Sequence, residues 1–182
     1  MRTALVLGGA ANVWADLEAA LDLGEFSGVI TCNDVTVAYP GPIDACCSLH
    51  ASSWGRWLAD REARGFPCPG KVLGHLDAKG IRQSEADGYV EFRFPGQDRS
   101  GSSGLFALKV ALIDMGFDRA VLCGVPMTAE QGHFFDARQW RGARAHRKGW
   151  EQALPHIADK ARSMSGWTRE LLGAPTKEWL AQ

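Results

Sequence analysis

Hydrophobic and polar positions alternate along this chain in a way that predicts strands and helices in turn. Short apolar runs fit buried strands at residues 3–7, 28–31, 43–49, 71–74, 89–94 and 120–123. Apolar residues at helical spacing follow at 13–21, 52–64, 105–115 and 150–161. Strands that alternate with helices are typical of a parallel sheet with helices on both faces. We therefore predict one α/β domain over residues 1–182, with a mainly parallel sheet of four to six strands flanked by helices.

The most apolar part of the chain, residues 100–127, predicts a loop, a buried helix, a strand and a second loop. Only Lys109 and Asp114 are charged within the helix, so it should be deeply packed. Three small residues open it: Ser102, Ser103 and Gly104. The unpaired N–H groups of a first helical turn can bind an anion, although an ordinary capped turn uses the same residue types. Because ligands of open α/β sheets gather at the carboxyl ends of strands, we interpret the loop as a phosphate-binding site.

Small or polar residues also follow the first two predicted strands. Gly8 and Gly9 come after the first strand, and Asn12 is placed to cap the next helix. Asn33 and Asp34 follow the second strand, where an amide and a carboxylate can bind a ribose hydroxyl or a base edge. Both turns also have structural explanations, since glycine turns join strands to helices in many folds and Asn-Asp favours an Asx turn.

Two histidines and a basic run come after the predicted strand at residues 120–123. His133 lies in a predicted loop, and His146 begins the buried face of the last long helix. An imidazole at that place can point into a site, while Arg144 and Arg147 beside it reach phosphates. A solvated basic helix face and a packing histidine are the structural alternatives. Pro155 should kink or restart this helix.

Residues 75–100 form a polar stretch with a short strand that leads into the glycine/serine loop. Long connections between elements often cover a functional site. We expect a flap or lid in this stretch.

Composition argues against several classes of function. A formal net charge of −1 gives no general attraction to nucleic acid or to an anionic membrane, so nucleic-acid binding through the basic run is the weakest interpretation. The five cysteines have no paired metal-ligand spacing, and no run approaches the roughly 20 apolar residues of a membrane span. We expect a cytoplasmic protein with reduced thiols and no metal site. Seven tryptophans leave a homo-oligomeric contact open as an alternative.

The order of these motifs resembles that of the small bacterial sialyltransferases that use CMP-activated sialic acid, and of their uncharacterised neighbours. The resemblance extends from residue 5 to about residue 157 and is strongest over 102–125. It implies a single Rossmann-like domain that binds a cytidine nucleotide without a metal. The implied nucleotide-binding residues are Gly8, Gly9, Asn33, Ser103 and Gly104.

The resemblance also implies roles for two histidines. The family's phosphate-binding tyrosine corresponds to His133, and its histidine general base corresponds to His146. Glycosyl transfer needs a base for the acceptor hydroxyl and positive charge near the leaving phosphate, and Arg144 or Arg147 would add to that charge. The sequence has no Asp-x-Asp pair of the kind that holds a metal with a diphosphate sugar, which favours a metal-free reaction.

We therefore expect a metal-independent, glycosyltransferase-like enzyme. Its donor would be a nucleotide sugar with CMP or another nucleotide as the donor moiety, and no further cofactor would be required. The alternative is a non-catalytic nucleotide- or nucleoside-binding protein, such as a phage or another mobile element encodes. Donor turnover above background separates the two hypotheses.

Overall fold

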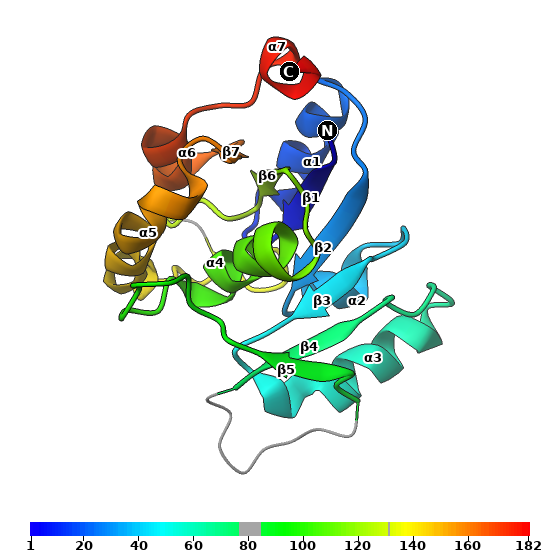
Figure 1. Cartoon of the computed structure of the whole chain (residues 1–182). Coiled ribbons are helices and arrows are strands. Elements are labelled where there is room, and N and C mark those ends of the chain that lie inside the picture. The colour runs from blue at the N-terminus through cyan, green and yellow to red at the C-terminus, as the bar shows by residue number, and fades with distance from the viewer. Residues whose placement is uncertain (77–84, 131) are drawn as a thin grey trace.

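Seven strands in the described part of the chain form one parallel sheet (Figure 1). The computed structural model describes residues 1–76, 85–130 and 132–182. The strands are β1 (Thr3–Leu7), β2 (Gly28–Cys32), β3 (Ala45–Cys47), β4 (Val72–His75), β5 (Gly88–Val90), β6 (Arg119–Cys123) and β7 (Ala161–Ser163). Their order is β5-β4-β3-β2-β1-β6-β7, and every neighbouring pair is parallel. The predicted parallel α/β fold is confirmed, with more strands than the four to six expected.

Helices cover both faces of this sheet. They are α1 (Val13–Leu21), α2 (Val35–Ala38), η1 (Ala51–Ser53), α3 (Trp54–Ala63), α4 (Ser102–Lys109), η2 (Val110–Asp114), α5 (Ala143–Ile157), α6 (Gly166–Leu172) and α7 (Lys177–Ala181). One core cluster joins the sheet to α4, η2 and α5, and a second joins the other face to α1 and α7. A third packs α2 and α3 against β3 and β4.

Strand β1 lies at the centre of the molecule, and all five of its residues are buried. Successive side chains of a strand point to opposite faces. Ala4 and Val6 accordingly enter the core with α4 and α5, whereas Leu5 and Leu7 enter the core with α1. An unbroken apolar run is the pattern expected of a parallel strand that is covered on both sides.

The two charges in the predicted buried helix pair with each other. Lys109 Nζ lies 2.9 Å from both carboxylate oxygens of Asp114, and Lys109 is buried. Helix α4 continues into η2, a π-helical turn in which the Met115 N–H donates to the Val110 carbonyl. Because a π turn brings residues i and i+5 together, the five-residue separation of Lys109 and Asp114 suits this pairing.

Two local predictions differ in part from the structure. Helix α5 is continuous from Ala143 to Ile157, so it does not restart at Pro155, which lies in its last turn. Asn12 takes the N-cap position of α1, but its side chain does not cap the helix. Its amide donates instead to Asp16 and to Ser165, which ties the first helix to the segment after β7.

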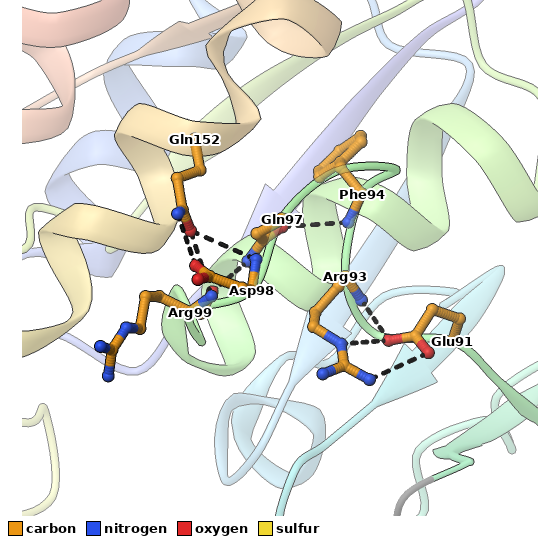
Figure 2. A network of polar contacts seen from close by, with 7 residues as sticks. All are labelled: Glu91, Arg93, Phe94, Gln97, Asp98, Arg99 and Gln152. Atoms are coloured by element: carbon orange, nitrogen blue, oxygen red, sulfur yellow. Dashed lines mark hydrogen bonds and ion pairs between the residues drawn. The ribbon is translucent and has the colours of Figure 1, made fainter.

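The structure describes part of residues 75–100, where a flap or lid is expected. Residues 77–84 lie outside the described residues. Figure 2 shows the following loop bound to α5, because Gln152 Oε1 accepts from the Asp98 and Arg99 N–H groups. Within the same loop, the Phe94 N–H donates to Gln97 Oε1, and Phe94 is buried. The loop therefore packs against α5.

Candidate functional site

A cavity of about 420 Å³ lies at the carboxyl ends of β1, β2, β3 and β6. Its walls are residues 8–10, 32–34, 49–50, 102–104, 124–128, 132–133, 135, 140 and 146. Strand β1 lies between β2 and β6, so the chain winds outward from it in both directions. This topological switch point is where ligands of open α/β sheets bind. No described residue of 75–100 contributes to the walls.

Strained backbone concentrates at this cavity. Within the described residues, three non-glycine residues have positive φ angles: Asn33 at 58°, Ser102 at 75° and Met127 at 51°. All three line the cavity. Each such conformation costs roughly 1–3 kcal/mol and persists only when its surroundings impose it, which is common at binding and catalytic sites.

A chain of hydrogen bonds connects the ends of β2 and β3 with the start of α4. Ser48 Oγ donates to Asn33 Oδ1 at 2.6 Å and accepts from the His50 N–H at 2.8 Å. Ser103 Oγ accepts from the Leu49 N–H at 3.3 Å. Because the Asn33 oxygen is used inside the protein, the nitrogen of the same amide is the atom that can donate to a ligand.

Asp34 extends this wall toward α3. Its Oδ1 accepts from Trp57 Nε1 at 2.8 Å and lies 3.9 Å from an Arg56 nitrogen. Among the described residues that line the cavity, Asp34 is the one carboxylate, and there is no lysine or arginine. The described walls therefore carry little charge and are more apolar than polar.

Two imidazoles that line the cavity have their Nδ1 atoms held by the main chain. His146 Nδ1 lies 3.2 Å from the Ser100 carbonyl oxygen, and His133 Nδ1 lies 3.1 Å from the Gly9 carbonyl oxygen. A carbonyl can only accept, so Nδ1 carries the hydrogen in each ring. Nε2 of the neutral ring then has a lone pair and can accept a proton. Nε2 is thus the nitrogen of each ring that can accept a proton from a ligand within hydrogen-bond reach.

The cavity brings together nine of the twelve residues that the sequence indicates. They are Gly8, Gly9, Asn33, Asp34, Ser102, Ser103, Gly104, His133 and His146. Asn12, Arg144 and Arg147 do not line it. The Arg147 guanidinium donates through two nitrogens to the Met127 carbonyl, at 3.1 and 2.9 Å, and Arg144 lies 3.7 Å from Glu130 at the surface. Arg147 thus holds the strained backbone of the loop after β6.

Thr128, Phe135 and Trp140 are among the lining residues that sequence reasoning did not indicate. Thr128 Oγ1 is buried and has no hydrogen-bond partner in the described part of the chain, and Phe135 and Trp140 form an aromatic wall. A buried hydroxyl without a partner is costly, so a polar ligand atom beside Thr128 would be stabilising. The sequence carries no motif around these residues, and only the path of the loop brings them to the cavity.

The glycines of the first turn fit tightly against the loop after β6. A Cβ atom on Gly8 would lie 2.5 Å from the Gly124 oxygen and 2.6 Å from Val125 Cγ2. One on Gly104 would lie 2.6 Å from Val125 Cγ1. Gly8 and Gly104 therefore allow the end of β1 and the start of α4 to pack closely against the loop after β6.

We expect Gly8→Ala to lower the free energy of unfolding by about 2 kcal/mol, within the range of overpacked cores, because backbone must move to admit the methyl group. Gly88→Ala is the matched control, since its Cβ would lie 3.8 Å from Leu73 Cδ2, an ordinary contact. Urea denaturation of both variants measures the difference. Equal stability losses would contradict the packing role of Gly8.

Two observations on the described residues concern metal ions and membrane spans. No three His, Cys, Asp or Glu side chains there come together as a group that could hold a metal ion. No helix in the described ranges combines the length and the apolar character that crossing a bilayer requires.

Comparison with known proteins establishes the fold. No family model matches the chain, and no curated protein does. The sialyltransferase CST-II in complex with a trisaccharide acceptor and CMP superposes with a TM-score of 0.63 at 12% identity, over 96% of this chain and 87% of that one. CstII from Campylobacter jejuni with the substrate analogue CMP-3FNeuAc gives 0.64 at 11% identity, over 97% and 88%. The protein is therefore a Rossmann-like α/β domain. More narrowly, its fold is sialyltransferase-like.

Proposed function

We propose that the protein is a glycosyltransferase-like enzyme that binds a CMP-activated sugar in the cavity between β1, β2 and β6. The observation that carries this proposal is the placement in one cavity of two imidazoles, each with Nδ1 bound to a main-chain carbonyl, and of the strained Asn33 and Ser102. The solved structures that share the fold support it, since they are sialyltransferases in complex with CMP or with a CMP-sugar analogue.

The residues have distinct roles in this proposal. His146 Nε2 accepts the proton of the acceptor hydroxyl while that oxygen bonds to the anomeric carbon of the donor. The bond between that carbon and the phosphate oxygen breaks, and CMP leaves with the electron pair. The glycine/serine loop binds the phosphate through the first N–H groups of α4, and Asn33 donates to the nucleotide. His133 lies beside the leaving phosphate, and the reaction requires no metal.

The test is a turnover assay with CMP-N-acetylneuraminic acid in the presence of EDTA. Release of CMP is followed by chromatography, with UDP-galactose and GDP-mannose as control donors. We expect CMP release above background from the first donor and none from the controls. No release from any donor would refute the transferase and leave nucleotide binding alone.

A non-catalytic nucleotide-binding protein is the second candidate. The observation in its favour is that Arg144 and Arg147, the cations expected to contact the phosphate, do not line the cavity. Binding of CMP without any turnover of CMP-sugars would select this candidate.

A further inference from the structure

The loop after β6, residues 124–128, forms one wall of the cavity, and all of its residues line it. This loop also contacts the first turn of α4. Ser102 Oγ donates to Met127 Sδ at 3.7 Å, and Val125 Cγ1 lies where only a glycine fits, 2.6 Å from a Cβ atom added to Gly104. The conformation of the loop therefore sets the position of the start of α4.

Three side chains from three helices hold this loop, and none of them lines the cavity. Each forms a hydrogen bond with the main chain of the loop, and the three are Asp16 on α1, Arg147 on α5 and Thr168 on α6. Thr168 donates to the Val125 carbonyl at 2.6 Å, and Asp16 accepts from the Gly124 N–H at 2.9 Å. Side chains in this arrangement can affect a ligand only through the conformation of the wall.

The carboxylate of Asp16 joins three parts of the fold at one atom. Asp16 is buried, and its Oδ2 accepts from the Gly124 N–H at 2.9 Å, from Asn12 Nδ2 at 3.0 Å and from Ser165 Oγ at 2.7 Å. Hydrogen bonds to an ionised acceptor are roughly twice as strong as those between neutral groups. This oxygen therefore ties α1 and the segment after β7 to the first residue of the loop.

Gly124 needs such a contact because glycine has no preferred conformation of its own. Its φ angle is 68°, and its carbonyl accepts from the Ala10 N–H at 3.1 Å. A Cβ atom at this position would lie 2.5 Å from Val13 Cβ, so no other residue fits. Since a glycine can adopt many other angles, the hydrogen bond to Asp16 selects the one that the loop requires.

We infer that Asp16 is a positioning residue of the site: its carboxylate fixes the loop after β6, and the loop fixes the first turn of α4. This inference rests on the proposed function, because it takes that turn to bind the phosphate of the nucleotide. Asn33, which is proposed to bind the nucleotide, lies at the end of β2, away from these contacts. Loss of the Asp16 carboxylate should therefore weaken binding of the phosphate and spare the nucleoside.

Calorimetric titration of the whole protein with CMP and with cytidine tests this inference. We expect Asp16→Ala to weaken CMP binding about tenfold, the effect of losing one hydrogen bond to a charged group, and to change cytidine binding by less than about twofold. Asp16→Asn should restore most of the CMP affinity, because its amide oxygen can still accept from the Gly124 N–H. Asp16→Ser, whose hydroxyl ends one bond short of that N–H, gives the same comparison if the alanine variant does not fold.

Asp44→Ala is the matched control. Asp44 Oδ2 also accepts from a main-chain N–H, that of Val29 at 2.8 Å, and Asp44 does not line the cavity. We expect this variant to bind CMP and cytidine as the wild type does.

Amide exchange of Gly124 provides a second measurement that needs no ligand. In NMR spectra of protein labelled with ¹⁵N-glycine, exchange at Gly124 should be about tenfold faster in Asp16→Ala than in the wild type, because its N–H loses its acceptor. The reference is the Gly70 N–H, which donates to the Ile43 carbonyl at 2.8 Å and should keep its rate.

The two measurements separate the positioning role from the proposed function. Equal weakening of CMP and cytidine in Asp16→Ala would make Asp16 a residue of general stability and overturn the inference. Unchanged CMP affinity despite faster exchange at Gly124 would overturn it as well, since the loop would then not govern the phosphate site. A wild type that binds neither ligand would refute the nucleotide site, and the exchange rate of Gly124 alone would then decide whether Asp16 fixes the loop.

Discussion

Replacing His146 with alanine is expected to lower the rate of sugar transfer by about 10²–10⁴-fold, the usual contribution of a positioned general base. The ring is fixed by the Ser100 carbonyl on Nδ1 and stacks on Trp140 with 5.5 Å between ring centres. Its Nε2 is then the atom that receives the acceptor proton. We expect the dissociation constant of CMP to change by no more than about threefold, because a base acts on the acceptor side of the reaction.

His156→Ala is the matched control for this prediction. His156 lies on the same helix, α5, but its Nε2 is bound to the Pro95 carbonyl at 2.8 Å and it does not line the cavity. Single-turnover rates and CMP titrations on both variants are the measurement. Loss of CMP affinity in His146→Ala, in proportion to the loss of rate, would make His146 a ligand contact and not a base.

Arg61→Ala is expected to cause a large loss of stability. The side chain is 1% exposed, and its guanidinium donates to four main-chain carbonyls, those of Thr36, Tyr39, Gly41 and Pro67. A buried acceptor that loses its donor costs about 1–3 kcal/mol, so we expect a loss of at least about 3 kcal/mol in the free energy of unfolding. Arg61→Lys should be intermediate, since one ammonium cannot reach all four oxygens.

Arg64→Ala provides the comparison, because Arg64 is an exposed residue at the end of the same helix. Urea denaturation followed by circular dichroism gives both free energies. A change in Arg61→Ala no larger than that in Arg64→Ala would show that the chain after β2 does not depend on this guanidinium. The result concerns the site as well, since Thr36 is two residues beyond Asp34 in the cavity wall.

Much of the fold could be predicted because its strands are buried on both faces. The apolar residues 4–7 of β1 and 120–123 of β6 predict buried strands, and the glycines and polar residues that follow them marked the edge that carries the site. Strand β7 could not be recognised, because it has only three residues, Ala161–Ser163, and two of them are polar. Its place in the sheet is set by pairing with β6.

Site residues next to the end of a strand or the start of a helix could be predicted. Site residues whose position depends on the course of a long loop could not. Asn33 comes directly after the end of β2, and Ser103 lies in the first turn of α4. Arg147 is next to His146 in sequence, yet one step along a helix turns its side chain to the Met127 carbonyl instead of the cavity. Thr128 and Trp140 lie in the long connection between β6 and α5, whose course depends on contacts with Gly9 and Asp136 that no local pattern reveals.

Calorimetric titration of CMP tests the central claim, which is that this cavity is a metal-independent cytidine-nucleotide site. We predict binding at one site per chain with the same affinity in EDTA as in buffer. Asn33→Gly, which keeps the backbone angle but removes the amide, should weaken binding, whereas Asn12→Gly outside the cavity should not. No binding of CMP, binding that EDTA abolishes, or equal effects of the two asparagine variants would contradict the account.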